Sequence, residues 1–234
     1  MKKQIPNILT SLNLFLGCQS IVASFNNELE LAAIFIGIAA VLDFFDGFVA
    51  RALNATGELG KQLDSLADVV SFGVAPGFIF YMLNNSCFGN EGFCINTYLP
   101  FLIPIFSALR LAKFNIDTRQ SNSFIGLPTP ANAIFIASIP FIISNDLWNV
   151  AWFFQNEWFL KIFPFVSAYL LVAELPLFAL KFKNLTWKEN QIRFVFILLA
   201  ILSLLVFQYL GIAISIVIYI LLSVYNNYNT SKTT

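Results

Sequence analysis

The sequence contains no histidine and only three cysteines among 234 residues. Imidazole is the commonest metal ligand and a frequent general base, so its absence excludes most zinc sites, haem sites and histidine-based catalysis. Any bound metal must therefore be held by oxygen atoms. Cys18 lies within a long apolar stretch and is expected to be a small apolar filler. Cys87 and Cys94 fall in a predicted outer loop, where a disulfide and two free thiols are both open.

Charge is also scarce, because only 11% of the residues are charged and 58% are hydrophobic. Soluble domains average about 25% charged residues, so this composition indicates an integral membrane protein. A transmembrane helix needs about 20 mostly apolar residues. Eight segments meet this need: 8–25, 31–53, 63–83, 98–115, 131–146, 158–180, 192–208 and 211–225. We therefore expect an all-α polytopic membrane protein that forms a single domain over residues 1–234.

Two features of this membrane arrangement remain as expectations. Only the short break around Gly211 separates the last two segments, so seven spans are also open. The first apolar segment lacks a small-residue cleavage site, and we expect it to be a span and not a cleavable signal peptide.

The distribution of cations predicts the orientation in the membrane. With eight spans, every lysine and arginine except Lys161 falls on one side. Positively charged loops face the cytoplasm, so both termini are expected there, with the protein in the inner (cytoplasmic) membrane.

The charged residues that interrupt the apolar pattern gather in one stretch. Among the thirteen acidic residues of the chain, four aspartates fall within two neighbouring predicted spans: Asp43, Asp46, Asp64 and Asp68. The first two share one helix face with Arg51, and the last two lie one helical turn apart. The short connection joins the two spans as a hairpin, so all four carboxylates can converge on one cytoplasm-facing cavity.

Such a cluster needs a cation. Pairing with Arg51 and Lys61 as helix-packing contacts is one reading, but two cations do not neutralise four close carboxylates. Carboxylate ligands favour Mg²⁺ or Mn²⁺, which often leave positions open for substrate phosphates. Gly47 would let a bulky ligand approach the helix backbone. An ion-coupled transporter is the alternative from another class; the charges lie near one surface and no inverted repeat is found, which disfavours it.

The spacing of these residues resembles a known family. The stretch from Asp43 to Asp68 matches the signature D-x2-D-G-x2-A-R-x8-G-x3-D-x3-D of the CDP-alcohol phosphatidyltransferases at every fixed position. Further stretches are similar to the serine-using branch of that family, the phosphatidylserine synthases: "IPNILTSLNLFLGCQSI", "DSLADVVSFGVAPG", "SALRLAKFN" and "FIGLPTPANA". The resemblance covers about residues 5–135.

The resemblance implies both a fold and a reaction. The fold is a six-helix catalytic core over about residues 5–183, usually dimeric, here followed by two further helices over about residues 190–226. The reaction transfers the phosphatidyl group of CDP-diacylglycerol to an alcohol and releases CMP, with L-serine as the acceptor in this branch. The implied partners are these two substrates, the lipid bilayer and a second copy of the chain, with no nucleic acid.

The resemblance also implies roles for individual residues. Two divalent metal ions, Mg²⁺ or Mn²⁺, are expected: one on Asp43, Asp46 and Asp64, the other on Asp43, Asp64 and Asp68. Asp68 is also the expected general base. Seven residues match positions that hold the cytidine diphosphate of the donor: Asn7, Thr10, Gly47, Arg51, Thr56, Gly57 and Gly60.

The acceptor site rests on less sequence information. Arg110 and Lys113 lie at the cytoplasmic end of a span, where they could bind the acceptor or be ordinary membrane anchors. Arg110 is the better candidate for a serine carboxylate, because its planar guanidinium can form a bidentate pair. The signature leaves glycerol 3-phosphate and inositol phosphate open as acceptors, and acyl and ether lipids open as donors. The roles of Glu174 and the "GLPTP" loop also stay open.

Overall fold

The computed structural model describes residues 4–53, 55, 57–88, 95–117, 123–178 and 186–233. The helices are α1 (Ile5–Phe25), α2 (Leu29–Ala52), α3 (Glu58–Asp68), the π-helical η2 (Val69–Val74), α4 (Ala75–Phe88), the 3₁₀ segment η3 (Ile95–Phe101), α5 (Leu102–Ile116), α6 (Thr129–Asn145), α7 (Ala151–Phe154), α8 (Glu157–Val172), α9 (Trp187–Phe207) and α10 (Tyr209–Thr233). Two short strands, β1 (Ser123–Ile125) and β2 (Pro176–Phe178), complete the described elements.

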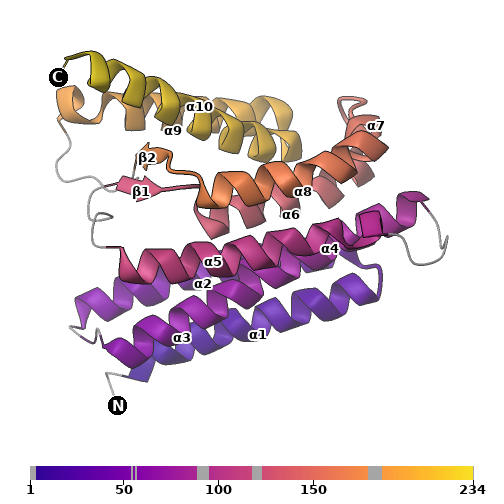
Figure 1. Ribbon diagram of the computed structural model, residues 1–234, viewed down its shortest axis with the longest axis horizontal. Helices are drawn as coiled ribbons and strands as arrows, with labels where there is room; N and C mark the ends of the chain where they lie inside the picture. Colours follow the sequence, from indigo (N-terminus) through magenta and orange to yellow (C-terminus); the bar gives the residue numbers. More distant parts are fainter. Residues whose placement is uncertain are drawn as a thin grey trace.

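The long helices run up and down along one common axis, and both ends of the chain lie at the same end of the bundle (Figure 1). α1 to α5 form one layer, α6 and α8 lie over them, and the hairpin of α9 and α10 covers the far side (Figure 1). The connections from α2 to α3, α5 to α6 and α8 to α9 share the end that carries the two termini (Figure 1). We call it the termini end.

A helix occupies each of the eight segments expected from the sequence, which confirms the all-α class. Six helical stretches among the described residues are long and apolar enough to cross a membrane. α6 and α8 have 17 and 16 residues, so each is about 25 Å long at 1.5 Å per residue, slightly less than a bilayer core. The last two predicted segments are separate helices, because the backbone breaks at Gln208 with φ of 50°.

The predicted span over residues 158–180 is wrong at its C-terminal end, where the structure has a strand. α8 ends at Val172, and Ala173 is extended with ψ of 141°. Pro176 follows; it has no amide hydrogen to donate and disfavours a helical residue before it. Strand β2 then pairs antiparallel with β1, with Phe124 opposite Leu177. This small sheet at the termini end was not expected from the sequence.

The surface and the interior have the polarity expected in lipid. Large apolar side chains such as Phe44, Phe48 and Leu205 point outward and are exposed. Several charged groups are buried instead, among them Asp68 and Arg110. Cys94 lies outside the described residues, so its pairing with Cys87 stays a prediction.

Gly126, which directly follows β1, combines a positive φ with close packing against α8. Its φ is 78°, and a Cβ there would lie 2.4 Å from the carbonyl oxygen of Leu171. We expect Gly126→Ala to lower the free energy of unfolding by about 1–3 kcal/mol, because alanine is strained at this φ and clashes with α8. Thermal unfolding in detergent measures this. Gly37→Ala is the control, since a Cβ at Gly37 meets nothing within 4 Å; equal losses in both variants would contradict the explanation.

Candidate active site

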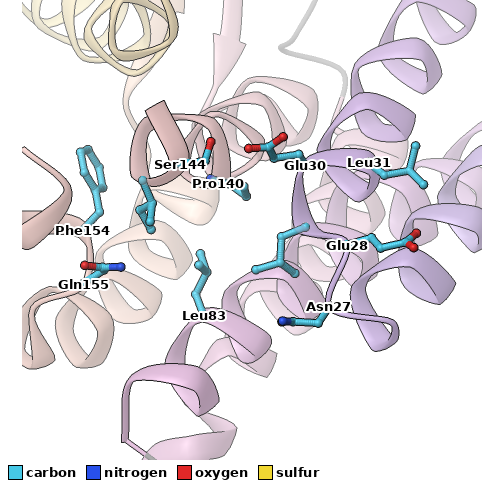
Figure 2. Close-up of a pocket in the computed structure, with 11 residues that line it drawn as sticks. Asn27, Glu28, Glu30, Leu31, Leu83, Pro140, Ser144, Phe154 and Gln155 are labelled. Atoms are coloured by element: carbon cyan, nitrogen blue, oxygen red, sulfur yellow. The ribbon is translucent and has the colours of Figure 1, made fainter. Parts of the chain in front are cut away.

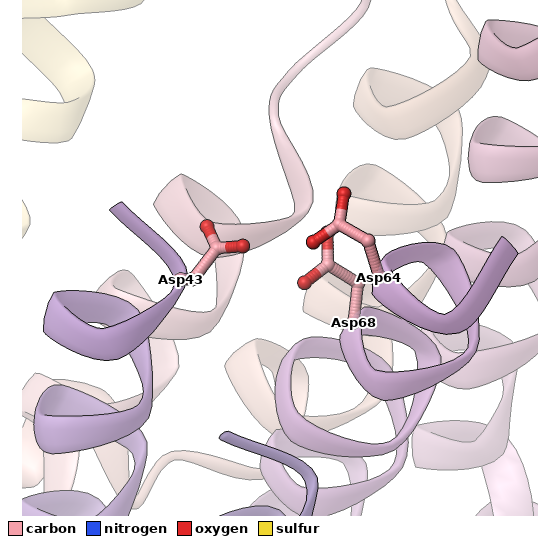
Figure 3. Close-up of side chains that lie close together, drawn as sticks. All are labelled: Asp43, Asp64 and Asp68. Atoms are coloured by element: carbon pink, nitrogen blue, oxygen red, sulfur yellow. The ribbon is translucent and has the colours of Figure 1, made fainter. Parts of the chain in front are cut away.

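Three of the four predicted aspartates converge at one point in the bundle. Asp43 reaches across from α2 toward Asp64 and Asp68, which lie one turn apart on α3 (Figure 3). One carboxylate oxygen of each residue lies within 4.8 Å of the other two. The structure therefore confirms that the two spans of the hairpin bring their carboxylates together.

The cluster lies inside the bundle, several helical turns away from the termini end. Asp43 lies nine residues before the end of α2, and Asp68 lies ten residues after the start of α3. At 1.5 Å per residue, these positions are about 14 and 15 Å from the helix ends. The π-helical segment η2 begins directly after Asp68, and short π-helical insertions are frequent at functional sites. The cluster is thus recessed from the ends of both helices.

The residues present fit a divalent cation. Oδ1 of Asp64 and Oδ1 of Asp68 are buried and have no hydrogen-bond partner among the described residues. Unpaired buried carboxylate oxygens are costly unless a cation or donor meets them. Because all three side chains offer oxygen ligands, the cluster suits a hard cation such as Mg²⁺ or Mn²⁺.

Asp46 is not among the carboxylates that lie within 4.8 Å of one another, although its charge interacts with those of all three. It is buried, and its Oδ2 accepts a hydrogen bond of 2.7 Å from Oγ1 of Thr10. The contact ties α2 to α1, and it joins a predicted metal ligand to a predicted donor-binding residue. A second metal on Asp43, Asp46 and Asp64 stays a prediction.

A pocket of about 200 Å³ adjoins the cluster at the termini end. Twelve residues line it: Pro6, Asn7, Thr10, Asp46, Gly47, Ala50, Arg51, Ala55, Gly57, Gly60, Lys61 and Asp64. Six of the seven predicted donor-binding residues are among them, and Thr56 lies outside the described residues. Asp64 belongs both to this pocket and to the carboxylate cluster. The structure therefore joins the expected nucleotide pocket to the expected metal site.

Two residues of this pocket make contacts that the sequence did not predict. A Cβ on Gly47 would lie 3.4 Å from Nη1 of Arg51, an ordinary van der Waals distance, so the guanidinium lies directly beside this glycine. Lys61 was considered in the sequence as a packing partner of the aspartates; it lines the pocket, and its Nζ donates a 3.1 Å hydrogen bond to the carbonyl of Asn115. Its position inside the signature, next to Gly60, was the available signal.

The two predicted acceptor-binding cations take opposite orientations. Arg110 is 6% exposed, and its Nε has no hydrogen-bond partner among the described residues. Its charge interacts with that of Asp68, and its guanidinium lies 5.9 Å from the ring centroid of Phe114. Lys113 on the same helix is exposed. Glu174, between α8 and β2, is exposed as well. Arg110 is therefore the cation that faces the cluster.

Close helix packing brings Arg110 to this position. A Cβ on Gly73 in η2 would lie 3.0 Å from Cβ of Ser107 on α5. Glycine at this contact allows the two backbones to approach closely, as small residues do between membrane helices. Arg110 is one turn further along α5, which directs it toward Asp68.

A larger cavity lies at the opposite end of the bundle and contains none of the predicted site residues (Figure 2). Its volume is about 630 Å³, and it is lined by Asn27, Glu28, Leu29, Glu30, Leu31, Leu83, Pro140, Ile143, Ser144, Phe154 and Gln155. We place the site at the smaller pocket because the buried carboxylates are there.

Several known proteins are similar to this chain in amino-acid sequence. A CDP-diacylglycerol–serine O-phosphatidyltransferase of Helicobacter pylori is 42% identical over 133 residues, which cover 56% of this chain and 54% of that protein. The protein of the same name from Bacillus subtilis is 37% identical over 138 residues, or 58% of this chain and 75% of the relative. An archaetidylserine synthase of Methanothermobacter thermautotrophicus is 37% identical over 139 residues, or 57% of this chain and 56% of the relative.

The matched segment spans little more than half the length of the Helicobacter and archaeal relatives. The sequence profile of the CDP-alcohol phosphatidyltransferases matches residues 3–180, which contain the carboxylate cluster, the adjoining pocket and Arg110. This match extends well beyond half of the chain, and the chain belongs to the CDP-alcohol phosphatidyltransferase family.

Proposed function

We propose that this protein transfers the phosphatidyl group of CDP-diacylglycerol to the hydroxyl of L-serine, giving phosphatidylserine and CMP. The observation that carries the proposal is the position of Asp64, which lines the predicted nucleotide pocket and belongs to the carboxylate cluster. To cleave the bond between CMP and the phosphatidyl group, the metal-binding carboxylates must adjoin the pocket that holds the nucleotide. The names of the bacterial relatives support serine as the acceptor.

The donor would bind with its cytidine diphosphate in the small pocket and its lipid tails toward the bilayer. Arg51 and Lys61 line that pocket and offer cationic donors to the phosphate oxygens. Asp43, Asp64 and Asp68 would hold the divalent cation, with Asp46 as an additional ligand if a second one binds. When bound, these ions would neutralise the pyrophosphate and stabilise the departing CMP.

Asp68 is the proposed general base. As the serine hydroxyl oxygen forms its bond to phosphorus, the O–H proton moves to the Asp68 carboxylate and the P–O bond to CMP breaks. Proton transfer of this kind typically contributes about 10²–10⁴ in rate. The buried position of Asp68 beside Arg110 supports this role, because a guanidinium nearby can hold the serine carboxylate while the hydroxyl reaches the base.

Arg110 is the proposed anchor for the serine carboxylate. We expect Arg110→Ala to raise the KM for serine about ten- to hundredfold, the range for losing hydrogen bonds to a charged group, while the KM for CDP-diacylglycerol changes little. Steady-state kinetics with each substrate varied separately measures both values. Arg110→Lys keeps the charge but not the planar fork, so its effect should be intermediate. An equal effect from Lys113→Ala would contradict the assignment.

The reaction itself is tested by incubating the purified protein with CDP-diacylglycerol, Mn²⁺ and a panel of labelled alcohols. Phosphatidylserine and CMP should form in equal amounts with L-serine. A lipid product from glycerol 3-phosphate or inositol phosphate, with none from serine, would refute the acceptor and leave family membership intact. An ether-linked donor included in the panel tests the lipid preference that the archaeal relative raises.

The placement in the cell follows from the same proposal. The protein would lie in the inner membrane with the termini end facing the cytoplasm, where CDP-linked lipids and serine meet. Arg51, Lys61 and Lys113 all lie near that end, which supports this orientation. A homodimer is also proposed, with a catalytic core over about residues 5–183 and two additional helices over about residues 190–226; the family resemblance supports both.

A further inference from the structure

α10 makes two hydrogen bonds to the short strand β2. Oη of Tyr219 donates a 2.9 Å bond to the carbonyl of Phe178, and Nδ2 of Asn227 donates to the carbonyl of Pro176. The ring of Tyr219 packs edge-on against Phe178, with centroids 5.0 Å apart, and also contacts Phe196 of α9. Both ends of β2 are thus held by the last helix of the described chain.

β2 in turn holds the segment that leads into α6. It pairs with β1, and the following Gly126 and Leu127 donate backbone hydrogen bonds to the carbonyls of Leu175 and Leu170. These bonds fix the turn before α6 against the end of α8. The start of α6 is therefore positioned both by the pairing of β1 with β2 and by bonds to the end of α8 and to Leu175.

The first turns of α6 carry buried polar groups whose hydrogen bonds are incomplete. Oγ1 of Thr129 and Nδ2 of Asn132 have no partner among the described residues, although both side chains are buried. Oδ1 of Asn132 accepts a 2.8 Å bond from Ser167 of α8, which orients the amide. α6 and α5 both pack against η2, the segment that begins after Asp68. Buried polar groups normally have hydrogen-bond partners, and a small polar substrate would supply the missing ones here.

Tyr219 also interacts electrostatically with the proposed acceptor anchor. It is 6% exposed and lies within electrostatic range of the Arg110 guanidinium. Its hydroxyl is oriented by the bond to Phe178. One side chain therefore contacts β2 and lies within electrostatic range of Arg110.

We propose that Tyr219 is a positioning residue for the acceptor: from α10 it fixes β2, the turn before α6 and the surroundings of Arg110, and so sets the affinity for serine. The inference rests on the proposed function, since it concerns the same acceptor site. α9 and α10 lie beyond residues 3–180, the part matched by the family profile. The C-terminal hairpin is thereby assigned a role in substrate affinity in addition to packing.

The test compares Tyr219→Phe with the wild-type protein in detergent. The variant keeps the ring and loses the hydroxyl, so we expect the KM for serine to rise about five- to tenfold, as for the loss of one buried hydrogen bond. The KM for CDP-diacylglycerol should stay within about twofold. In a double variant with Arg110→Ala the two effects should be less than additive, because both act on one subsite.

Ser215→Ala is the matched control. Ser215 is a buried residue of the same helix whose hydroxyl bonds Gly211 and Ser203 within the α9–α10 hairpin. It should lower Tm by an amount comparable to Tyr219→Phe and leave the KM for serine unchanged. An unchanged serine KM in Tyr219→Phe, or an equal rise in Ser215→Ala, would overturn the proposal. If the alcohol panel identifies another acceptor, the serine assignment fails, and the KM of that acceptor decides the role of Tyr219.

Discussion

Chelation of divalent cations with EDTA is expected to reduce turnover to background, and Mg²⁺ or Mn²⁺ should restore it. The reason is the cluster of Asp43, Asp64 and Asp68, whose oxygens lie within 4.8 Å of one another and include buried atoms with no donor among the described residues. Without a cation, these carboxylates would repel the pyrophosphate of the donor. CMP release measured against metal concentration tests this.

Zn²⁺ should restore activity poorly, because a cluster of carboxylates lacks the nitrogen and sulfur ligands that zinc favours. A second readout does not depend on catalysis: Mg²⁺ or Mn²⁺ should raise Tm, since a ligand that binds only the folded state stabilises it. Full turnover in EDTA, or a Tm that no divalent cation changes, would remove the basis for a metal site.

Asp64→Asn is expected to lower kcat/KM on the order of a thousandfold or more, and Asp43→Asn should be similar. Asp64 is the residue shared by the cluster and the nucleotide pocket, so its loss should weaken both metal binding and donor placement. Asp68→Asn should be nearly inactive too, yet bind the donor better than Asp64→Asn, because Asp68 does not line that pocket. Kinetics combined with donor-binding measurements separates these outcomes.

Glu58→Gln is the matched control for these variants. Glu58 is an exposed acid at the start of α3, the helix that carries Asp64 and Asp68, so the substitution removes the same charge outside the site. Its activity should stay close to wild type. If Asp68→Asn also turned over at nearly the wild-type rate, the general-base assignment would be wrong.

Much of the site could be predicted because its information is local in the sequence. Asp43 and Asp68 are 25 positions apart along one helical hairpin. Helical periodicity places Asp43 and Asp46 on one face of the first helix, and Asp64 and Asp68 on one face of the second. The donor-binding residues were expected from the family resemblance, and six of those seven line the pocket because they belong to this hairpin or to the helix before it.

The acceptor site could not be predicted to the same depth. Arg110 and Lys113 are three positions apart and chemically alike, and only the packing of α5 against η2 shows that the first is buried and the second exposed. The place of Lys61 in the pocket lining likewise depends on how α1, α2 and α3 pack together.

The sequence by itself determined the membrane class, the eight helical segments and the carboxylate hairpin, because hydrophobic length and helical spacing act within a segment. Only the tertiary structure decided that Asp46 accepts a hydrogen bond from Thr10 and that α10 supports β2 through Tyr219. The hydrogen bond from Tyr219 joins residues 41 positions apart, across an interface whose geometry depends on how whole helices pack. No local pattern encodes such a contact, because its two partners meet only after the bundle has assembled.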